Sequence, residues 1–305
     1  MITNVRCTPA VRAIFVANLV AQMAIVVTGA VVRVTNSGLG CPTWPECVEG
    51  SYVPTTRQAE TWHKYVEFGN RMLTFALVVL AVAAIVAVIA DMRRRSRLGL
   101  PSRRVLLLLA CIPILGTVAQ AVLGGITVLT GLHPATVSAH FLLSMAIIAG
   151  CVALVVRSRD PGDQPVIMLV RREIRVLTWG LVAIAGVVVL LGVIVTGSGP
   201  HSGDPLSENR FSFDPRTMSW LHADVVLLFL GLLAALLLAL RLTDAPTGAR
   251  RAAWILTGVA VAQGAVGYIQ YFTGLPIVAV IVHVTGAVCV WAAVLFVPAA
   301  ERSRG

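Results

Sequence analysis

Long apolar segments recur along the whole chain, separated by short segments that carry most of the charged residues. Each apolar segment has about 20 residues or more, the length that a helix needs to cross the roughly 30 Å hydrocarbon core of a membrane. The segments lie at 13–33, 64–90, 104–128, 138–156, 176–197, 217–240, 252–273 and 277–298. The pattern therefore predicts an all-α polytopic membrane protein with eight transmembrane helices.

The chain also repeats itself at a fixed spacing. Residues 119–140 recur at 262–283, where matching Ala-Gln, Gly, Ile, Thr-Gly-Leu and His positions are all separated by 143 residues. A similar short motif ends the first and fifth helices, at 35–38 and 196–199. Because four crossings are an even number, two such units share one orientation and are related by an axis along the membrane normal. We predict two repeated four-helix bundles, at 1–157 and 158–305.

Composition and charge sharpen this interpretation. Charged residues make up 12% of the chain and hydrophobic residues 57%, whereas a soluble domain has about a quarter charged residues. The net charge of +10 comes from Arg clusters between apolar segments, so we expect no nucleic-acid partner. With the N-terminus inside, 18 Lys and Arg lie on the inner side and six on the outer side. The positive-inside rule therefore predicts cytoplasmic termini and contact with anionic membrane lipid.

Three histidines, His140, His222 and His283, lie near the outer ends of the fourth, sixth and eighth helices. A polar side chain in hydrocarbon costs free energy unless it has a partner, so an intramembrane His indicates a function. Two His on facing helices of a bundle can bind one haem iron from both sides. His222 and His283 belong to one repeat and favour such a site. The alternative is that each His bonds a backbone carbonyl and packs helices.

The repeat predicts a matching ligand on the second helix, near its outer end. Glu67 and Arg71 lie there, four residues apart on one helical face. A carboxylate at this depth either forms an ion pair that fixes the helix, or acts at a reacting carbon as a base or by stabilising positive charge. The residues alone leave both roles open.

The first outer loop carries Cys41 and Cys47. A pair at this spacing on the oxidising side of a membrane favours a disulfide. The link is either a structural staple or a reducible redox switch. A metal site is disfavoured, because no second Cys or His pair follows at zinc spacing.

The motifs taken together resemble the haem A synthase family, over nearly the whole chain. They are TGAVVRVTNSGLGCPTWPEC at 28–47, EFGNR at 67–71, AQAVLGGITV at 119–128 and VTGSGPHSGD at 195–204, with the three His above. The resemblance implies an enzyme of the bacterial plasma membrane that oxidises the C8 methyl of haem O to a formyl group, through hydroxylated intermediates, to give haem A. The Arg-dominated composition is similar to that of a high-GC bacterium such as an actinobacterium.

The resemblance also implies where the haems bind. Haem b iron would have His222 and His283 as axial ligands in the second half, and the substrate haem O would have His140 as one ligand in the first half. Both sites would lie toward the outer face, and electrons would leave through haem b to an acceptor that the sequence does not identify. Expected partners are haem O synthase and cytochrome oxidase assembly factors, and a homo-oligomer stays open.

One position departs from the family pattern. The usual E-x-x-H-R motif appears here as Glu67 to Arg71 with Asn70 in the place of the His. Three arrangements of the substrate haem follow: five-coordinate iron, a water held by Asn70, or ligation by His63, seven residues earlier on a similar face. In each, we predict that Glu67 stabilises a cationic intermediate at the methyl.

Two functions of other classes compete with this interpretation. The first is a non-catalytic membrane b-type cytochrome or haem-handling protein, which would bind haem without making haem A. The second is a small-molecule transporter, favoured by the repeat alone but leaving the paired His without a purpose. Haem O synthase activity is disfavoured, because no Asp-rich motif is present to hold Mg-diphosphate.

Overall fold

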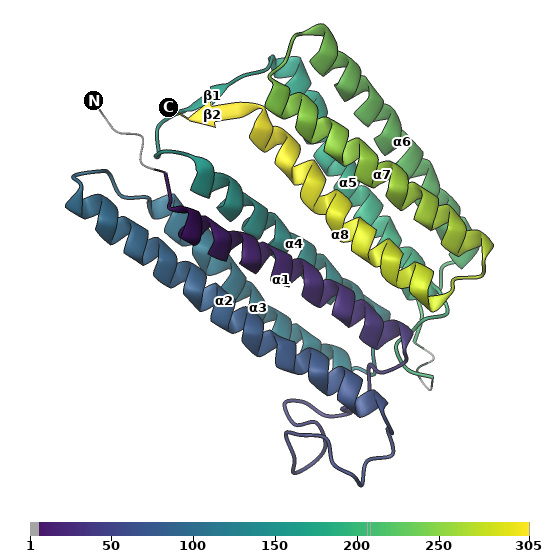
Figure 1. Ribbon diagram of the computed structural model, residues 1–305. Helices are drawn as coiled ribbons and strands as arrows, with labels where there is room; N and C mark the ends of the chain where they lie inside the picture. The colour runs from purple at the N-terminus through teal and green to yellow at the C-terminus, as the bar shows by residue number, and fades with distance from the viewer. Residues whose placement is uncertain (1–5, 206, 208, 305) are drawn as a thin grey trace.

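The computed structural model describes residues 6–205, 207 and 209–304, which form eight long helices and one pair of short strands (Figure 1). The elements are α1 (Pro9–Val34), α2 (His63–Arg97), α3 (Arg104–Leu129), α4 (Pro134–Arg159), β1 (Val166–Met168), α5 (Arg172–Ser198), α6 (Pro215–Leu242), α7 (Thr247–Phe272), α8 (Ile277–Ala300) and β2 (Arg302–Arg304). All eight helices are long and apolar enough to cross a membrane. The predicted all-α polytopic fold is confirmed.

Most helices extend past the apolar segments that predicted them. Helix α2 continues to Arg97, although its apolar segment ends at 90, because Arg is a good helix former and a helix need not stop where hydrocarbon ends. Helix α4 starts at Pro134, a residue suited to the first helical position, and the ring of His133 accepts the Ala135 N–H at 3.3 Å as its N-cap. The apolar pattern thus marks the membrane core rather than the helix ends.

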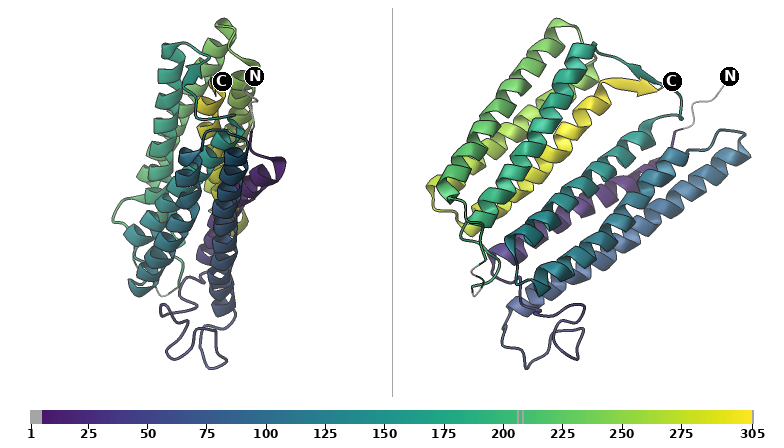
Figure 2. Two further views of the ribbon diagram at one scale, coloured as in Figure 1. Left: turned by 90° about the vertical axis from the view of Figure 1, so that its left-hand side faces the viewer. Right: turned by 180° about the vertical axis from the view of Figure 1, so that it is seen from behind.

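The helices contact one another as two rings of four. Helix α1 contacts α2 and α4, and α3 contacts the same two; helices α5 to α8 repeat this arrangement. Helices α2 and α4 are therefore diagonal in one ring, and α6 and α8 in the other. In Figures 1 and 2 helices α1 to α4 form one group and helices α5 to α8 a second group beside it. The predicted boundary at 157 falls in the last turn of α4, and residues 1–5, 206, 208 and 305 of the predicted halves lie outside the described residues.

The two rings meet through α1 with α8, α4 with α5, and α4 with α8. In the repeat, α5 corresponds to α1 and α8 to α4. Exchanging the halves therefore converts the contact of α1 with α8 into the contact of α5 with α4. This is the contact pattern of an approximate two-fold axis that passes between α4 and α8. It matches the axis along the membrane normal that four crossings per unit require.

The packed core of each ring lies toward the end of the molecule that carries both chain termini, which we call the terminal end. Fully buried residues there include Phe15, Leu106 and Ile148 in the first ring, and Leu233 and Leu256 in the second. The opposite end, which carries the long loop 35–62, is called the loop end (Figure 1). The three histidines lie on the loop-end side of both cores.

A buried polar network occupies the terminal end. Arg103 has no exposed surface, and its guanidinium donates to the carbonyl oxygens of Arg157 at 2.5 Å and Asp160 at 3.0 Å. Arg157 in turn pairs with the Asp160 carboxylate at 2.5 Å, and Arg95 is also buried. The sequence counts all three only among the cations of the inner side; in the structure, protein carbonyls and carboxylates hold them.

The linker between the halves is joined to the chain end. Strand β1 pairs antiparallel with β2, so that Val166 lies opposite Arg304 and Met168 opposite Arg302. Both of these arginines also approach the Asp160 carboxylate, at 3.6 Å from Arg302 and 3.4 Å from Arg304. The sequence did not predict this pairing, because three-residue strands are too short to show an alternating pattern.

Candidate functional site

Four polar residues lie at one level of the molecule. Asn70, His140, His222 and His283 each follow the first residue of α2, α4, α6 or α8 by six or seven positions. At a rise of about 1.5 Å per residue, this level is roughly 10 Å from the loop end. His140 and His222 lie near the ends of their helices rather than at the first residue, because the polar first turns of α4 and α6 are already helical.

The histidines of the second half face each other across the ring. The His222 and His283 ring centroids are 6.5 Å apart, with ring planes inclined by 64°, and they come from the diagonal helices α6 and α8. Metal–imidazole bonds of about 2 Å on each side would separate two such centroids by roughly 6 Å. Nδ1 of His222 is buried without a hydrogen-bond partner among the described residues. The pair therefore fits axial ligation of one metal ion.

Two glycines make space for these rings. A methyl group on Gly192 of α5 would lie 3.4 Å from Cε1 of His222, and one on Gly267 of α7 would lie 3.2 Å from Cε1 of His283. Each ring therefore packs flush against the backbone of the preceding helix. Within the described part of the chain, no group of three or more His, Cys, Asp or Glu gathers as a metal site, so the donor set suits haem iron better than zinc.

The same level is built differently in the first half. His140 packs against Gly124 of α3, where an added methyl would lie 3.3 Å from its Cε1. Its Nδ1 is buried and has no hydrogen-bond partner in the described residues. On the diagonal helix α2, Asn70 accepts a hydrogen bond from the Thr28 hydroxyl at 2.7 Å. One imidazole and one amide thus replace the imidazole pair of the second half.

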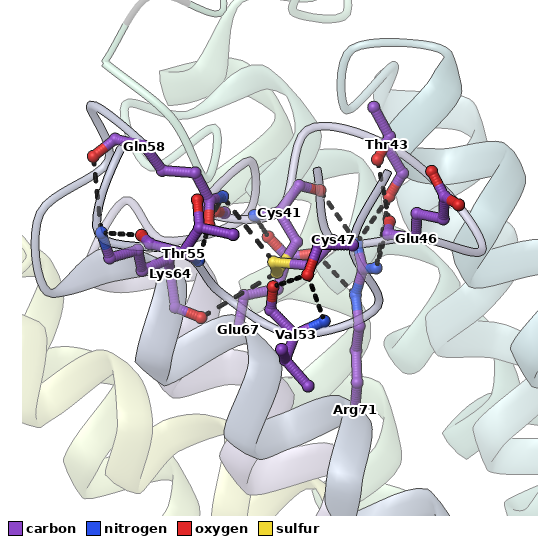
Figure 3. Close-up of a disulfide and its surroundings, with 12 residues drawn as sticks. Cys41, Thr43, Glu46, Cys47, Val53, Thr55, Gln58, Lys64, Glu67 and Arg71 are labelled. Atoms are coloured by element: carbon purple, nitrogen blue, oxygen red, sulfur yellow. Dashed lines mark hydrogen bonds and ion pairs between the residues drawn. A yellow bond between two sulfur atoms is a disulfide. The ribbon is translucent and has the colours of Figure 1, made fainter. Parts of the chain in front are cut away.

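Glu67 lies one turn from Asn70, toward the loop end, and both of its oxygens are engaged (Figure 3). Oε1 accepts from Arg71 at 2.5 Å and 3.1 Å, and Oε2 accepts from the backbone N–H of Cys41 at 2.7 Å. Arg71 also donates to the carbonyl oxygens of Cys41 at 2.9 Å and Thr43 at 3.2 Å. The ion pair that the sequence offered as one role of Glu67 is present, and it anchors the outer loop to α2.

The predicted disulfide is confirmed, since Cys41 and Cys47 are bonded and almost wholly buried. Lys64 donates to the Thr55 carbonyl at 2.8 Å, and so ties a later part of the loop to α2 (Figure 3). At Gly40 any side chain would collide with the backbone of His63. The disulfide loop therefore lies directly on the start of α2.

His63 takes part in this loop contact. Its Nδ1 lies 2.9 Å from the Ser37 hydroxyl, and its ring stacks on Trp62 with centroids 4.0 Å apart. The ring is thus held at the first residue of α2, two turns from Asn70. Whether it ligates a substrate iron stays a prediction.

Contacts at the loop end join the two halves, through Arg33, which the sequence counted only as a cation. Arg33 of α1 donates to the carbonyl oxygens of His201 at 2.7 Å and Thr196 at 2.9 Å. Gly38 donates its N–H to the Gly203 carbonyl at 2.8 Å. The ends of α1 and α5, where the repeated motifs lie, are therefore joined through Arg33 and through Gly38.

Eight candidate membrane-spanning helices, two related rings and an opposed imidazole pair define this class of protein as a multi-pass helical membrane protein with paired histidines near one end. The chain belongs to the COX15-CtaA family of cytochrome oxidase assembly proteins, whose profile matches residues 12–295. The family resemblance drawn from the motifs is therefore confirmed.

Relatives agree with this family. The chain is 30% identical to the Heme A synthase of Symbiobacterium thermophilum, over 87% of this chain and 89% of that protein. A shorter match, 32% identical, joins 23% of this chain to 21% of the Heme A synthase of Geobacillus kaustophilus. The Heme A synthase of Lysinibacillus sphaericus is 30% identical over 46% of this chain and 42% of its own length.

Proposed function

We propose that this chain is a haem A synthase, an oxidoreductase that converts the C8 methyl of haem O into a formyl group. The net change adds one oxygen atom from water to the methyl carbon and releases four protons and four electrons. The electrons pass to an external one-electron acceptor. The observation that carries the proposal is the opposed His222 and His283 pair, at haem-ligating separation in a chain of this family. Relatives named Heme A synthase support the same activity.

His222 and His283 would hold haem b, which supplies one-electron redox chemistry when it is bound. The chain's own contribution is to fix the two rings. Gly192 and Gly267 let both rings lie against backbone, and the low-polarity ring of helices keeps water from them. The imidazoles would then bind iron in their neutral form, each through one ring nitrogen.

His140 would bind the iron of haem O in the first half, at the level of Asn70. An amide nitrogen has no lone pair to give to a metal, and the Asn70 oxygen already accepts from Thr28. Asn70 is therefore a poor replacement for a second His. This supports a substrate with His140 as its single protein ligand, the arrangement that leaves bound haem easiest to release.

Glu67 would have two roles in this reaction. Its carboxylate holds the Cys41 amide and Arg71, which keeps the disulfide loop over the start of α2. Its negative charge, one turn from the Asn70 level, would also stabilise positive charge that develops at the methyl before water adds. Only the second role depends on the charge itself.

Orientation and partners follow the same proposal. The terminal end would face the cytoplasm and the loop end the outside, as the distribution of Lys and Arg predicts. A single cysteine placed at Gly50 in the exposed loop, in a chain without Cys7, should react with an impermeant maleimide in whole cells. One placed at the exposed Gly248, in the first turn of α7, should react only after the cells are lysed. Haem O synthase and cytochrome oxidase assembly factors remain proposed partners.

The decisive experiment uses the full chain purified from a host that makes haem O. We expect a reduced-minus-oxidised spectrum of a b-type haem, and chromatography of the extracted haems should show haem A. Bound haem without any haem A would identify a non-catalytic cytochrome or haem-handling protein instead. A preparation that binds no haem would contradict the proposed function altogether.

The charge role of Glu67 is tested by Glu67→Gln. The amide oxygen can still accept the Cys41 N–H, so the loop, the disulfide and the bound haem should persist, while haem A formation falls by about 100-fold or more. Arg71→Lys is the matched control, because it keeps a cation beside Glu67. Unchanged turnover in Glu67→Gln would leave Glu67 with its structural role only.

A further inference from the structure

Two glutamines on odd-numbered helices hold the ligand-bearing helices in the same way. Gln120 of α3 donates its side-chain amide to the carbonyl oxygen of His140 at 2.9 Å. Gln263 of α7 donates to the carbonyl oxygen of His283 at 2.8 Å. The two pairs are related by the 143-residue repeat, so each bundle ties the backbone of one histidine to its neighbouring helix.

The second contact of each glutamine differs between the halves. Nε2 of Gln263 lies 3.0 Å from Nδ1 of the His283 ring. Nε2 of Gln120 instead lies 2.6 Å from the Ser144 hydroxyl, and Nδ1 of His140 has no hydrogen-bond partner among the described residues.

The sequence contains the cause of this difference. Ser144 lies one turn after His140, and its hydroxyl also donates to the His140 carbonyl at 3.2 Å. The residue at the same place in the repeat, 143 positions later, is Ala287. Because Ala287 has no hydroxyl to bind the glutamine, the amide of Gln263 turns to the His283 ring.

A partner at the second ring nitrogen fixes the orientation and basicity of a ligating histidine, and its loss typically weakens metal binding by about 10- to 100-fold. A neutral imidazole that binds iron through Nε2 carries its proton on Nδ1. Oε1 of Gln263 has no partner in the described structure, and a half-turn of the amide would present it to that proton. No equivalent partner reaches the His140 ring while Ser144 holds Gln120.

We propose that Ser144 is a positioning residue that diverts Gln120 from the His140 ring, and thereby makes the first-half haem exchangeable, whereas Gln263 opposite Ala287 secures the second-half haem. The inference rests on the proposed function, because it assigns the exchangeable place to a haem that must enter as substrate and leave as product. His140 and His283, which are related by the repeat, would therefore differ in how firmly they hold haem.

The test measures haem release from each half separately. In the His283→Ala background the second-half site is disrupted, so that release of haem from His140 in the first half is measured. In the His140→Ala background the first-half site is disrupted, so that release from the second half is measured. Purified protein loaded with iron protoporphyrin is mixed with excess apomyoglobin, and the Soret band follows the transfer. We expect Ser144→Ala to slow release from the first half about tenfold, and Ala287→Ser to accelerate release from the second half by a similar factor. Ser138→Ala, which removes another hydroxyl of α4, should leave the rate unchanged.

Release rates that are equal for Ser144→Ala and its parent would overturn the inference. The inference would also be overturned if Ser138→Ala slowed haem release as much as Ser144→Ala. Haem that binds and exchanges as expected, in a protein that makes no haem A, would instead contradict the proposed catalytic function while leaving the difference between the ligands intact. Failure of both halves to bind haem would overturn both.

Discussion

The two halves share one helix arrangement but treat its ligand level differently. In the second half His222 and His283 face each other at 6.5 Å, and a glutamine contacts the ring of one. In the first half His140 has an unpartnered ring nitrogen, and Asn70 is bonded to Thr28. The duplicated scaffold thus carries two differently built sites, which we call the closed site in the second half and the open site in the first. We propose that the closed site holds a resident cofactor and that the open site receives a passing substrate.

The halves differ again at the loop end. The connection between α1 and α2, residues 35–62, is longer than the one between α5 and α6, residues 199–214, and contains the disulfide. In the first half Glu67 and Arg71 hold this loop on α2. The loop therefore lies beside the half that we propose to bind haem O, where a substrate must enter.

The largest effect should follow from breaking the closed site. His283→Ala removes one of the two proposed axial ligands, and we expect haem in the second half to fall by more than about tenfold, with haem A formation lost. The haem-to-protein ratio of the purified chain measures this. His133→Ala is the control, since this exposed ring only caps α4, and its haem content should match the parent. A His283→Ala chain with a full haem complement would exclude His283 as a ligand.

The next effect should come from making the open site resemble the closed one. Asn70→His places an imidazole opposite His140, so we expect a six-coordinate, low-spin haem spectrum in the first half and release slower by about tenfold or more. The His283→Ala background isolates this half in the spectrum. Asn70→Ala removes the amide without adding a ligand and should show no such change. A spectrum of Asn70→His identical to that of its parent would mean that the two positions do not share one iron.

A smaller effect is expected from the disulfide. Joint replacement Cys41→Ser and Cys47→Ser opens a short covalent loop, which should cost about 2 kcal/mol of stability and lower the melting temperature in detergent by several degrees. If the link is a staple, haem A formation per folded molecule is unchanged. Turnover that disappears while stability and haem content persist would instead indicate a redox switch. Cys111→Ser, a free cysteine of α3, is the control.

The smallest effect concerns the terminal end of the second half. Glu301 is buried and accepts from the Thr178 hydroxyl at 2.5 Å, and burial raises its pKa above the ordinary value for Glu. The folded chain therefore keeps the proton to higher pH than the unfolded chain, and loses stability as pH rises through the folded pKa. Glu301→Gln should raise the melting temperature by roughly 2 °C at pH 8 and by less at pH 5. An equal shift at both pH values would contradict the raised pKa.

Much of the fold was predictable because a membrane permits few solutions. Hydrocarbon forces each backbone polar group to be satisfied within its own helix, so apolar length alone located all eight helices. The ion pair of Glu67 and Arg71 was equally predictable, since four positions on a helix bring side chains together. The disulfide followed from the short spacing of Cys41 and Cys47.

Contacts between distant segments were not predictable in this way. The sequence contains Gln120 and Ser144, but no local rule states that the amide of one helix binds a hydroxyl of the neighbouring helix. The burial of Arg103 is a similar case. The sequence counts it only as one of the inner-side cations, and only the folded chain brings the carbonyls of 157 and 160 to its guanidinium.

The sequence by itself determined the number of helices, the repeat, the family and the residues able to bind iron, because hydrophobic length, spacing and residue chemistry are local properties of a chain. Tertiary structure decided which of these residues face each other and which are already occupied. His222 and His283 become a pair only because diagonal helices point them at one centre. His140 differs from His283 in that its glutamine, Gln120, lies 2.6 Å from the Ser144 hydroxyl, whereas Gln263 contacts the His283 ring.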